Sequence, residues 1–252
     1  MKQDQIALQL YTVRANAQED FLGTLRAVAE MGYPAVEFAG FGGLSAQELR
    51  RSLDELGLRA SGAHVRLEEF ASRLLDVCAE LRTLGAEYAI VPWLPEDRRG
   101  DVDQTRWLAQ SFNEWGARCR EEGIHFGYHN HDFEFQPLPG EQPTTMWESL
   151  LNETDPSVVC LELDIYWARF AGADPLQLIR EHGARFPLLH LKDMSAAEDR
   201  AYTTFGDGVI DWPPILEATE ATAAWYVVEH DNPPDPLADS ARALRYLEGL
   251  AE

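Results

Sequence analysis

Residues 124–135 read IHFGYHNHDFEF, a mostly apolar segment that runs directly into a cluster of ionisable groups. The first five residues have the apolar and aromatic character of a buried strand. The polar cluster after them consists of His129, Asn130, His131, Asp132 and Glu134. An ordinary strand exit needs only Gly, Asn or Asp to turn, whereas imidazole and carboxylate groups are ligands that divalent cations accept. The segment therefore indicates a strand that ends at the edge of an active site.

Three further apolar runs end in the same way. They read VVCLELD at 158–164, FPLLHLKD at 186–193 and WYVVEHD at 225–231. Charged groups at the carboxyl ends of several buried strands are typical of a (β/α)8 barrel, whose active sites lie on that face. A length of 252 residues fits one such barrel, and no linker-like change of composition divides the chain. The sequence thus predicts an α/β fold, a (β/α)8 TIM barrel, as a single domain over residues 1–252.

Strand-like and helix-like segments alternate from end to end. Expected strands cover 6–11, 35–38, 58–64, 88–93, 124–128, 158–164, 186–190 and 225–229. Expected helices cover 18–31, 45–57, 67–84, 103–122, 146–152, 174–183, 213–221 and 236–250, and 192–212 is expected to be a long loop. Aromatic residues of the helices, such as Trp107, are expected to pack in the core or between helices. An open doubly wound sheet is the alternative, but the turn after the first strand, Leu10–Arg14, lacks the glycines of a phosphate-binding loop.

The composition is strongly acidic, with 43 Asp and Glu against 21 Lys and Arg and a formal charge of −22. Such a charge disfavours nucleic-acid and anionic-membrane partners, which need a basic face. No apolar stretch reaches the length of a membrane span or of a signal peptide, so a cytoplasmic location is expected. Cys78, Cys119 and Cys160 are expected to be reduced cysteines of the core.

Asp164, His190 and Glu229 end three strands that would be neighbours around a barrel, so they are predicted to share one divalent cation. The fourth ligand is expected from the fifth strand or the sixth. His129 is preferred, and His131, Glu134 and Glu162 remain alternatives. For any one of these residues, the simpler interpretation is a polar strand end that is hydrogen-bonded to a loop.

Other candidates lie at or just past predicted strand ends. Glu37, His131 and Lys192 are expected to assist catalysis with Glu229, although Glu37 could equally form an ion pair in the end layer of the barrel and Lys192 could lie on the surface. The substrate-binding candidates are Tyr11, His64, Trp93, Glu162 and Trp167. By contrast, His125 in mid-strand and His182 before a helix-ending glycine are expected to be structural.

Seven motifs together resemble a known family. They are LQLYTVR (8–14), GYPAVE (32–37), YHNHDFEF (128–135), LELDIYW (161–167), HLKD (190–193), FGDG (205–208) and VEHD (228–231). In this order they resemble the sugar phosphate isomerase/epimerase family, the xylose isomerase-like TIM barrels. That group includes ketose 3-epimerases, hydroxypyruvate isomerase, inosose dehydratase and endonuclease IV, and the resemblance covers nearly the whole chain.

The resemblance implies a divalent metal ion (Mn, Co, Zn or Mg), which ketose epimerases hold with a Glu, Asp, His, Glu quartet. By position, the last three ligands fall on Asp164, His190 and Glu229. The first falls on His129, where this sequence departs from the glutamate. In the epimerases two metal-bound glutamates exchange the proton on the two faces of the carbon. Here only Glu229 remains, so a histidine at 129 or 131 replaces the other base, or the chemistry differs.

These observations predict a metal-dependent isomerase or epimerase of a small, unphosphorylated polyhydroxylated ketone, acting by proton abstraction next to the carbonyl through a metal-bound enediolate. One alternative is a dehydratase or lyase of a keto-inositol or 3-keto sugar, similar to inosose dehydratase. The other is a metabolite-binding barrel without turnover. The charge argues against an endonuclease IV-like activity, and a homodimer is left open. Metal affinity is expected to fall as the pH drops through roughly 6–7, where histidine titrates.

Overall fold

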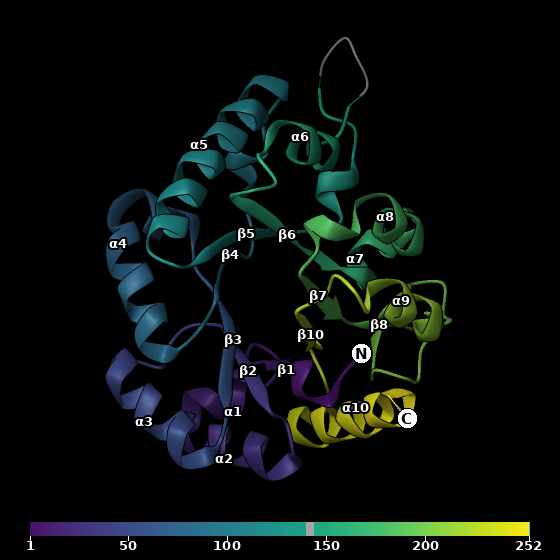
Figure 1. Ribbon diagram of the computed structural model, residues 1–252. Helices are drawn as coiled ribbons and strands as arrows, with labels where there is room; N and C mark the ends of the chain where they lie inside the picture. The colour runs from purple at the N-terminus through teal and green to yellow at the C-terminus, as the bar shows by residue number, and fades with distance from the viewer. Residues whose placement is uncertain (140–143, 252) are drawn as a thin grey trace.

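Parallel strands close into a barrel in the computed structural model of the chain, which describes residues 1–139 and 144–251 (Figure 1). The barrel strands are Ile6–Gln9 (β1), Ala35–Phe38 (β2), Arg59–His64 (β3), Tyr88–Val91 (β4), His125–His129 (β5), Val159–Asp164 (β6), Leu188–Leu191 (β7) and Trp225–Val228 (β10). Ala7 of β1 is in register with Ala35 of β2 on one side and with Val227 of β10 on the other, which closes the ring. The predicted (β/α)8 barrel is confirmed.

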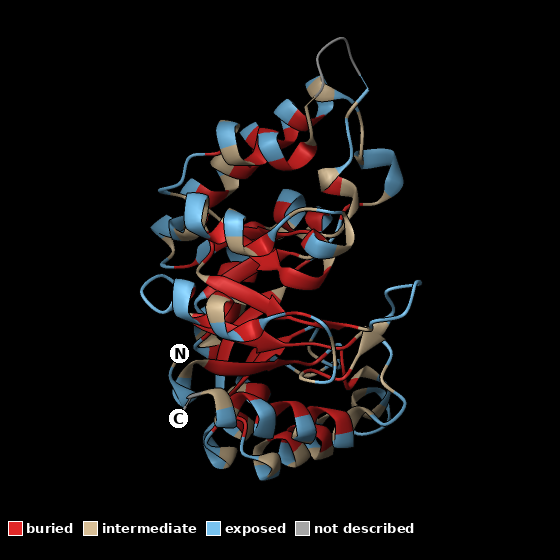
Figure 2. Ribbon diagram, turned by 90° about the vertical axis from the view of Figure 1, so that its right-hand side faces the viewer, coloured by how far each residue is buried: buried red, intermediate tan, exposed pale blue. Residues whose placement is uncertain are grey.

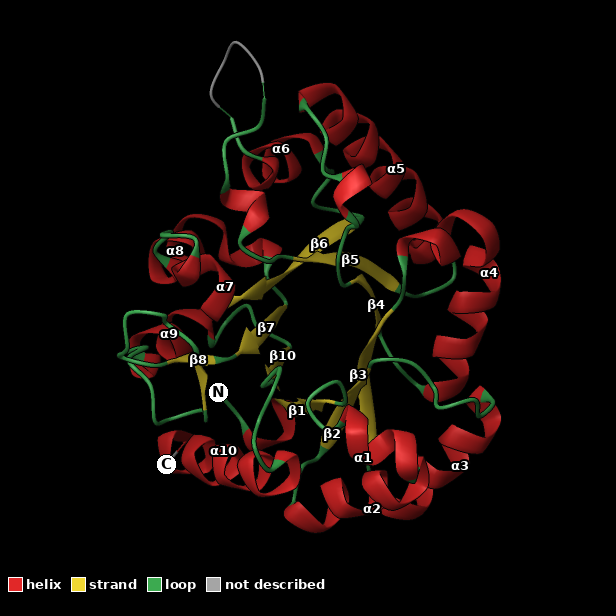
Figure 3. Ribbon diagram, turned by 180° about the vertical axis from the view of Figure 1, so that it is seen from behind, coloured by secondary structure: helices red, strands yellow, loops and turns green. Residues whose placement is uncertain are grey.

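The helices surround this barrel (Figures 1 and 3). They are Arg14–Glu19 (α1), Phe21–Met31 (α2), Ala46–Leu56 (α3), Leu67–Leu84 (α4), Val102–Glu121 (α5), Met146–Glu153 (α6), Ile165–Phe170 (α7), Pro175–His182 (α8), Trp212–Thr219 (α9) and Pro236–Ala251 (α10). Short 3-10 turns lie at Gln3–Gln5 (η1), Glu96–Arg98 (η2), Phe133–Phe135 (η3) and Gly183–Arg185 (η4). Burial is concentrated in the strands and in the helix faces that cover them (Figure 2). No helix of the described residues is long and apolar enough to cross a membrane.

Local signals place several helix ends where the sequence predicts them. Ser45 and Glu48 form a reciprocal capping box at the start of α3. Gly32 ends α2 with a φ of 102°, and Gly85 ends α4 with a φ of 75°, conformations that side chains with a Cβ rarely adopt. The first predicted helix is divided, because Asp20 leaves helical geometry, ends α1 and caps α2 through Gly23 N.

The inside of the barrel changes from apolar to ionisable along its axis. Its lower part is filled by a cluster of Ala7, Ala35, Tyr88, Ile90, Leu188, Trp225 and Val227. Because alternate residues of a strand face the same side, the next inward positions on β7 and β10 are His190 and Glu229. Gly127 of β5 leaves room for this packing, since a Cβ there would lie 2.6 Å from Ile90 Cδ1. The apolar layer thus supports a polar layer at the carboxyl ends of the strands.

Four details correct the sequence-based expectations. The expected loop 192–212 contains an antiparallel pair, Asp193–Met194 (β8) and Tyr202–Thr203 (β9). Trp107 is 56% exposed rather than buried, since it lies about 100° around α5 from Leu108, which is buried. His125 begins β5 and is exposed, so it is not a mid-strand residue. The three cysteines are free as expected, but Cys160 is only partly buried. The extent of the domain, residues 1–252, stays a prediction.

Candidate active site

The candidate site begins where the inward-facing residues of the barrel become ionisable. His129 ends β5, Asp164 ends β6, His190 lies on β7 and Glu229 follows β10. One ligand atom from each lies within 4.8 Å of the others, and all four residues are buried. His129 Nε2 is 3.7 Å from Asp164 Oδ2, and His190 Nδ1 is 2.8 Å from Glu229 Oε2. We call these four residues the upper group; the structure brings together the ligands that the sequence predicts, and their role as ligands stays a prediction.

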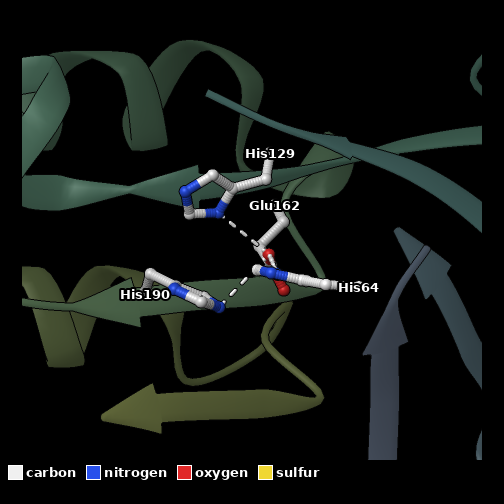
Figure 4. A group of neighbouring side chains, drawn as sticks. All are labelled: His64, His129, Glu162 and His190. Carbon is white, nitrogen blue, oxygen red and sulfur yellow. Dashed lines mark hydrogen bonds and ion pairs between the residues drawn. The ribbon is translucent and has the colours of Figure 1, made fainter. Parts of the chain in front are cut away.

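A second set of side chains lies directly against the upper group and shares its two histidines (Figure 4). This lower group comprises His64, His129, Glu162 and His190. Glu162 Oε2 is 2.8 Å from His64 Nε2, 2.9 Å from His129 Nδ1 and 3.2 Å from His190 Nε2. Each shared imidazole therefore presents one nitrogen to the upper group and the other to the lower group.

Glu37 completes the support of the lower group. Its Oε2 atom lies 2.8 Å from His190 Nε2 and 3.3 Å from His64 Nε2, and it accepts a 2.7 Å hydrogen bond from Gln9 Nε2. Burial, together with the nearby Glu162 carboxylate, raises the pKa of Glu37. Glu37 and Glu162 are fully buried, so the structure places them behind the predicted ligands, in the end layer of the barrel. Gln9 belongs to the same layer. It follows the inward-facing Ala7 by two residues, so strand alternation predicts that Gln9 also faces the inside of the barrel.

These contacts determine which nitrogen of His129 is available. Burial alone would raise the pKa of Glu162, but His190 and His64 hold it well below its usual range, so Glu162 is ionised. Its carboxylate accepts a hydrogen bond from the protonated Nδ1 of His129, which leaves the lone pair on Nε2 directed toward the upper group. Burial, assisted by positive charge on His190, lowers the pKa of His129 to about 3. His129 is therefore neutral at pH 6–7, and the expected fall of metal affinity in this range, which stays a prediction, would have to come from other residues of the site.

His190 has the opposite character. Burial alone would lower the pKa of His190, but the Glu162 and Glu229 carboxylates outweigh it and raise this pKa well above its usual range. Both ring nitrogens face carboxylates at 2.8 Å, Nδ1 toward Glu229 and Nε2 toward Glu37. An imidazolium satisfies both contacts as a donor.

Lys192 is buried, which rules out the alternative of a surface lysine. Its Nζ atom lies 3.0 Å from Asp164 Oδ2, 2.8 Å from Glu229 Oε2 and 3.1 Å from Asp231 Oδ1. Burial alone would lower the pKa of Lys192, but these three carboxylates raise it well above its usual range. The ammonium thus lies between two of the predicted ligands. Asp231 was not singled out from the sequence, although it follows Glu229 by two residues in the same motif.

Glu134 is not part of either group. Its carboxylate accepts hydrogen bonds from the Tyr128 hydroxyl at 2.6 Å and from the His131 backbone N–H at 2.7 Å. It therefore holds the segment after β5 in place rather than supplying a ligand atom to the groups. Burial raises its pKa to about 8. The charged motif alone gave no means of separating this role from that of a ligand.

A cavity of about 680 Å³ opens above the upper group. Its walls include Tyr11, His64, Trp93, His131, Lys192 and Glu229. Trp167, which the sequence suggests as a substrate wall, is not among the described residues that line this cavity; its ring packs 5.3 Å from that of His131. Arg66 and Glu69 also line the cavity and were not predicted, although Arg66 follows His64 by two residues.

The donor set and its unsatisfied atoms fit a divalent cation. Asp164 Oδ2 is buried and accepts no hydrogen bond, since Lys192 makes only an ion pair with it. The upper group combines two imidazoles with two carboxylates, the ligand types that Zn, Mn and Co accept. Burial raises the pKa of Asp164 to about 6, so protonation of this predicted ligand, like that of His190, would compete with a cation in mildly acidic solution.

Comparisons with known proteins agree with this architecture. A family model described as the xylose isomerase-like TIM barrel matches residues 25–248. Inosose dehydratase of Geobacillus thermodenitrificans (strain NG80-2) is 29% identical over 174 residues, which is 60% of this chain and 57% of that protein. The chain thus spans little more than half the length of the curated relatives it first matches.

Solved structures extend the likeness over the whole chain. A crystal structure of a sugar phosphate isomerase/epimerase from Parabacteroides distasonis ATCC 8503 has a TM-score of 0.85 and 25% identity, and covers 100% of this chain and 95% of that one. L-ribulose 3-epimerase has the same fold, with a TM-score of 0.75 at 14% identity over 98% of this chain and 94% of that one. These relatives are named as enzymes of small sugars or polyols. The chain belongs to the xylose isomerase-like TIM barrel family.

Proposed function

We propose that this protein is a metal-dependent isomerase or epimerase that abstracts a proton next to the carbonyl of a small polyhydroxylated ketone. The observation that carries the proposal is the buried upper group on the floor of a cavity, in which Glu162 leaves Nε2 of His129 free to bind. Family relatives with epimerase and dehydratase names support the same class of chemistry.

His129, Asp164, His190 and Glu229 would hold the cation. A divalent cation at such a site supplies a Lewis acid that polarises a carbonyl. The neutral imidazole of His129 and the ionised carboxylate of Glu229 are ready to bind, whereas His190 must release a proton and Asp164 must be ionised. The chain thereby couples cation binding to proton release.

Residues of the cavity wall would handle the proton and the developing negative charge. His131 lines the cavity, and burial lowers its pKa well below the usual range. A neutral imidazole can accept the proton from the carbon. Lys192 places a positive charge where an enediolate oxygen would develop. Glu229, which also lines the cavity, is the second proton-transfer group, and epimerisation requires it to act on the face of the carbon opposite His131.

Dehydration is the second candidate, and one observation favours it. His129 stands where the resemblance implies a second glutamate, and the curated relatives are inosose dehydratases. Loss of a β-hydroxyl from the same enediolate needs a proton donor instead of a second carboxylate base. The cationic Lys192, at the cavity wall, can donate a hydrogen bond to the departing hydroxyl.

Two measurements test the proposal. Protein purified without chelator should contain about one divalent ion per chain, and Asp164→Asn and His190→Ala should lose it, whereas Asp207→Asn, a change in a side chain that is 55% exposed, should not. Unchanged metal content in both site variants would place the cation elsewhere. In deuterated water, a panel of ketoses, inososes and 3-keto sugars should gain deuterium next to the carbonyl, and product identity separates epimerisation from dehydration. Bound metal without exchange for any panel member would favour a metabolite-binding barrel.

A further inference from the structure

The cavity has two chemically different halves. His129 at the end of β5, with His131, Lys192, Glu229 and Asp231, which follow β5, β7 and β10, forms the ionisable half. His64 of β3 borders this half, with its ring centroid 5.3 Å from that of His129. The other half is built by segments that follow β1 to β4, with Tyr11, Gly40, Arg66, Glu69, Pro92 and Trp93 on its walls. A reacting ketone would occupy the ionisable half. The second half is therefore available to bind a substituent of the ketone.

The size of the cavity exceeds the needs of a single small sugar. At about 30 Å³ for each water-sized atom, 680 Å³ corresponds to roughly twice the non-hydrogen atoms of a hexose. Pockets of about 300–1,000 Å³ usually enclose ligands larger than one sugar ring. Gly40 lines the cavity, and a Cβ there would meet nothing within 4 Å.

Two aromatic rings in this half are exposed and held in fixed orientations. Tyr11 is 43% exposed and Trp93 is 46% exposed. The guanidinium carbon of Arg14 lies 4.0 Å from the Tyr11 ring centroid, and that of Arg99 lies 4.8 Å from the Trp93 ring.

Both arginines are themselves anchored. Arg14 donates to the backbone oxygen of Asp231 at 2.6 Å, and Arg99 donates to that of Leu94 at 2.8 Å. Each ring thus has one face covered by an anchored cation. Such preorganisation lowers the entropic cost of binding a ligand against the rest of the ring.

Charged side chains in this half are partly paired. Arg66 Nε lies 3.6 Å from Glu69 Oε1, and Glu69 also pairs with Arg73. A neutral ring with apolar C–H faces and hydroxyl edges matches aromatic rings flanked by polar groups.

We propose that the substrate is a two-ring ketone, a keto-disaccharide whose second sugar ring binds against Tyr11 and Trp93. This inference rests on the proposed function, because it assumes that the ketone itself lies over the upper group. It assigns the half of the cavity formed after β1 to β4 to the second ring, and it assigns specificity to Tyr11 and Trp93.

Calorimetric binding in Mn²⁺-containing buffer tests it. The probes are fructose and four glucosyl-fructoses, turanose, maltulose, leucrose and isomaltulose, which carry the glucose on different carbons. At least one of them should bind about tenfold or more tightly than fructose. Trp93→Ala and Tyr11→Ala should each remove most of this difference by weakening disaccharide binding more than fructose binding, and Trp93→Phe should restore part of it. Trp107→Ala, which alters an exposed tryptophan of α5, is the matched control and should change nothing.

The outcomes separate this inference from the proposed function. Equal affinity for fructose and all four disaccharides, or an equal loss of both in Trp93→Ala, overturns the second-ring assignment. Equally tight, Trp93-dependent binding of p-nitrophenyl glucoside would assign the half-cavity to an aromatic ring and overturn it too. Deuterium exchange, measured on the same preparations, decides the catalytic proposal independently: disaccharide preference without exchange supports the second-ring site and contradicts the enzyme.

Discussion

His129 stands at the position where the family resemblance implies a glutamate, and its surroundings explain how an imidazole can serve there. Glu162 accepts from Nδ1 at 2.9 Å, and the pKa of His129 is held at about 3 by burial. The imidazole ring is therefore neutral and fixed in orientation, with Nε2 available as a metal ligand. A carboxylate behind a metal-binding histidine commonly has this role, and here the carboxylate comes from the neighbouring strand β6.

Glu162→Gln tests that role. The amide keeps the shape of the side chain but loses the charge that orients three imidazole N–H groups, so metal affinity should fall by about 10–100-fold. Competition with a chromophoric chelator measures the affinity, with Asp207→Asn as the control. No change would show that Glu162 does not orient His129. Complete loss of binding would instead make Glu162 a ligand and move the cation into the lower group.

Glu134 should make the stability of the metal-free protein depend on pH. Its pKa is raised to about 8 in the folded state by burial, against an ordinary value near 4.5 in the unfolded chain. Between these two values the unfolded state ionises while the folded state stays neutral, so the contribution of this group to stability falls as pH rises from about 4.5 to 8. The total is at most a few kcal/mol.

Glu134→Gln, which is neutral at every pH, should remove that dependence. Unfolding midpoints from pH 5 to 9 should show the wild type losing stability relative to Glu134→Gln as pH increases. Glu217→Gln, a change in an exposed glutamate of α9, should run parallel to the wild type. A constant difference between wild type and Glu134→Gln across this range would mean that Glu134 is ionised in the folded protein.

The β8–β9 hairpin begins directly after Lys192. The carboxylate of Asp193 stabilises this segment by accepting several hydrogen bonds. Asp193 is buried and accepts from Gly206 N at 3.0 Å, Gly208 N at 3.2 Å and Trp212 Nε1 at 3.0 Å. These donors belong to the FGDG motif and to the start of α9. The motif is thus explained here as the partner of Asp193, and it shapes the segment beside Lys192.

Asp193→Ala should therefore loosen this element. Several buried N–H groups would lose a charged acceptor, at a cost of about 3 kcal/mol or more. The denaturation midpoint should fall, and the exposed tip at residues 196–200 should be cleaved faster by protease. Asp207→Ala removes only an exposed pair with Arg242 and should cost less than about 1 kcal/mol. Similar losses in the two variants would contradict the anchoring role of Asp193.

The closed barrel links the predicted ligands to global stability. They come from β5, β6, β7 and the end of β10, and β10 pairs with β1, so a bound cation connects the second half of the chain to the strand that begins it. Binding to the folded state alone stabilises by about 2.7 kcal/mol at a concentration of 100 Kd.

Zn²⁺ or Mn²⁺ should consequently raise Tm by roughly 5–10 °C in a chain of this size. A chelator should reverse the shift, and Asp164→Asn should not show it. Calorimetry or circular dichroism measures the midpoint. A shift that persists in Asp164→Asn would point to a cation bound outside the upper group.

The regular features of this protein are readable from its amino-acid pattern. Strand parity and the repeated polar strand endings identified the barrel, and they selected Asp164, His190 and Glu229 as neighbours, because parallel strands bring their carboxyl ends to one edge. Both inferences depend on local periodicity, which a single sequence displays. The same reasoning failed for Trp107. This residue precedes the buried Leu108 by one position, and one residue of a helix turns the side chain by about 100°, here toward solvent.

Only the tertiary structure decided which atoms face one another across the barrel. It placed Glu162 and Glu37 behind the histidines. It paired Glu134 with the Tyr128 hydroxyl, away from the upper group. It also positioned Lys192 between Asp164 and Glu229. The protonation of His129 and His190 follows from these neighbours, since burial and charge set a pKa through distance rather than through chain order. Residues far apart in sequence meet inside a closed barrel, and their electrostatics exist only once it has closed.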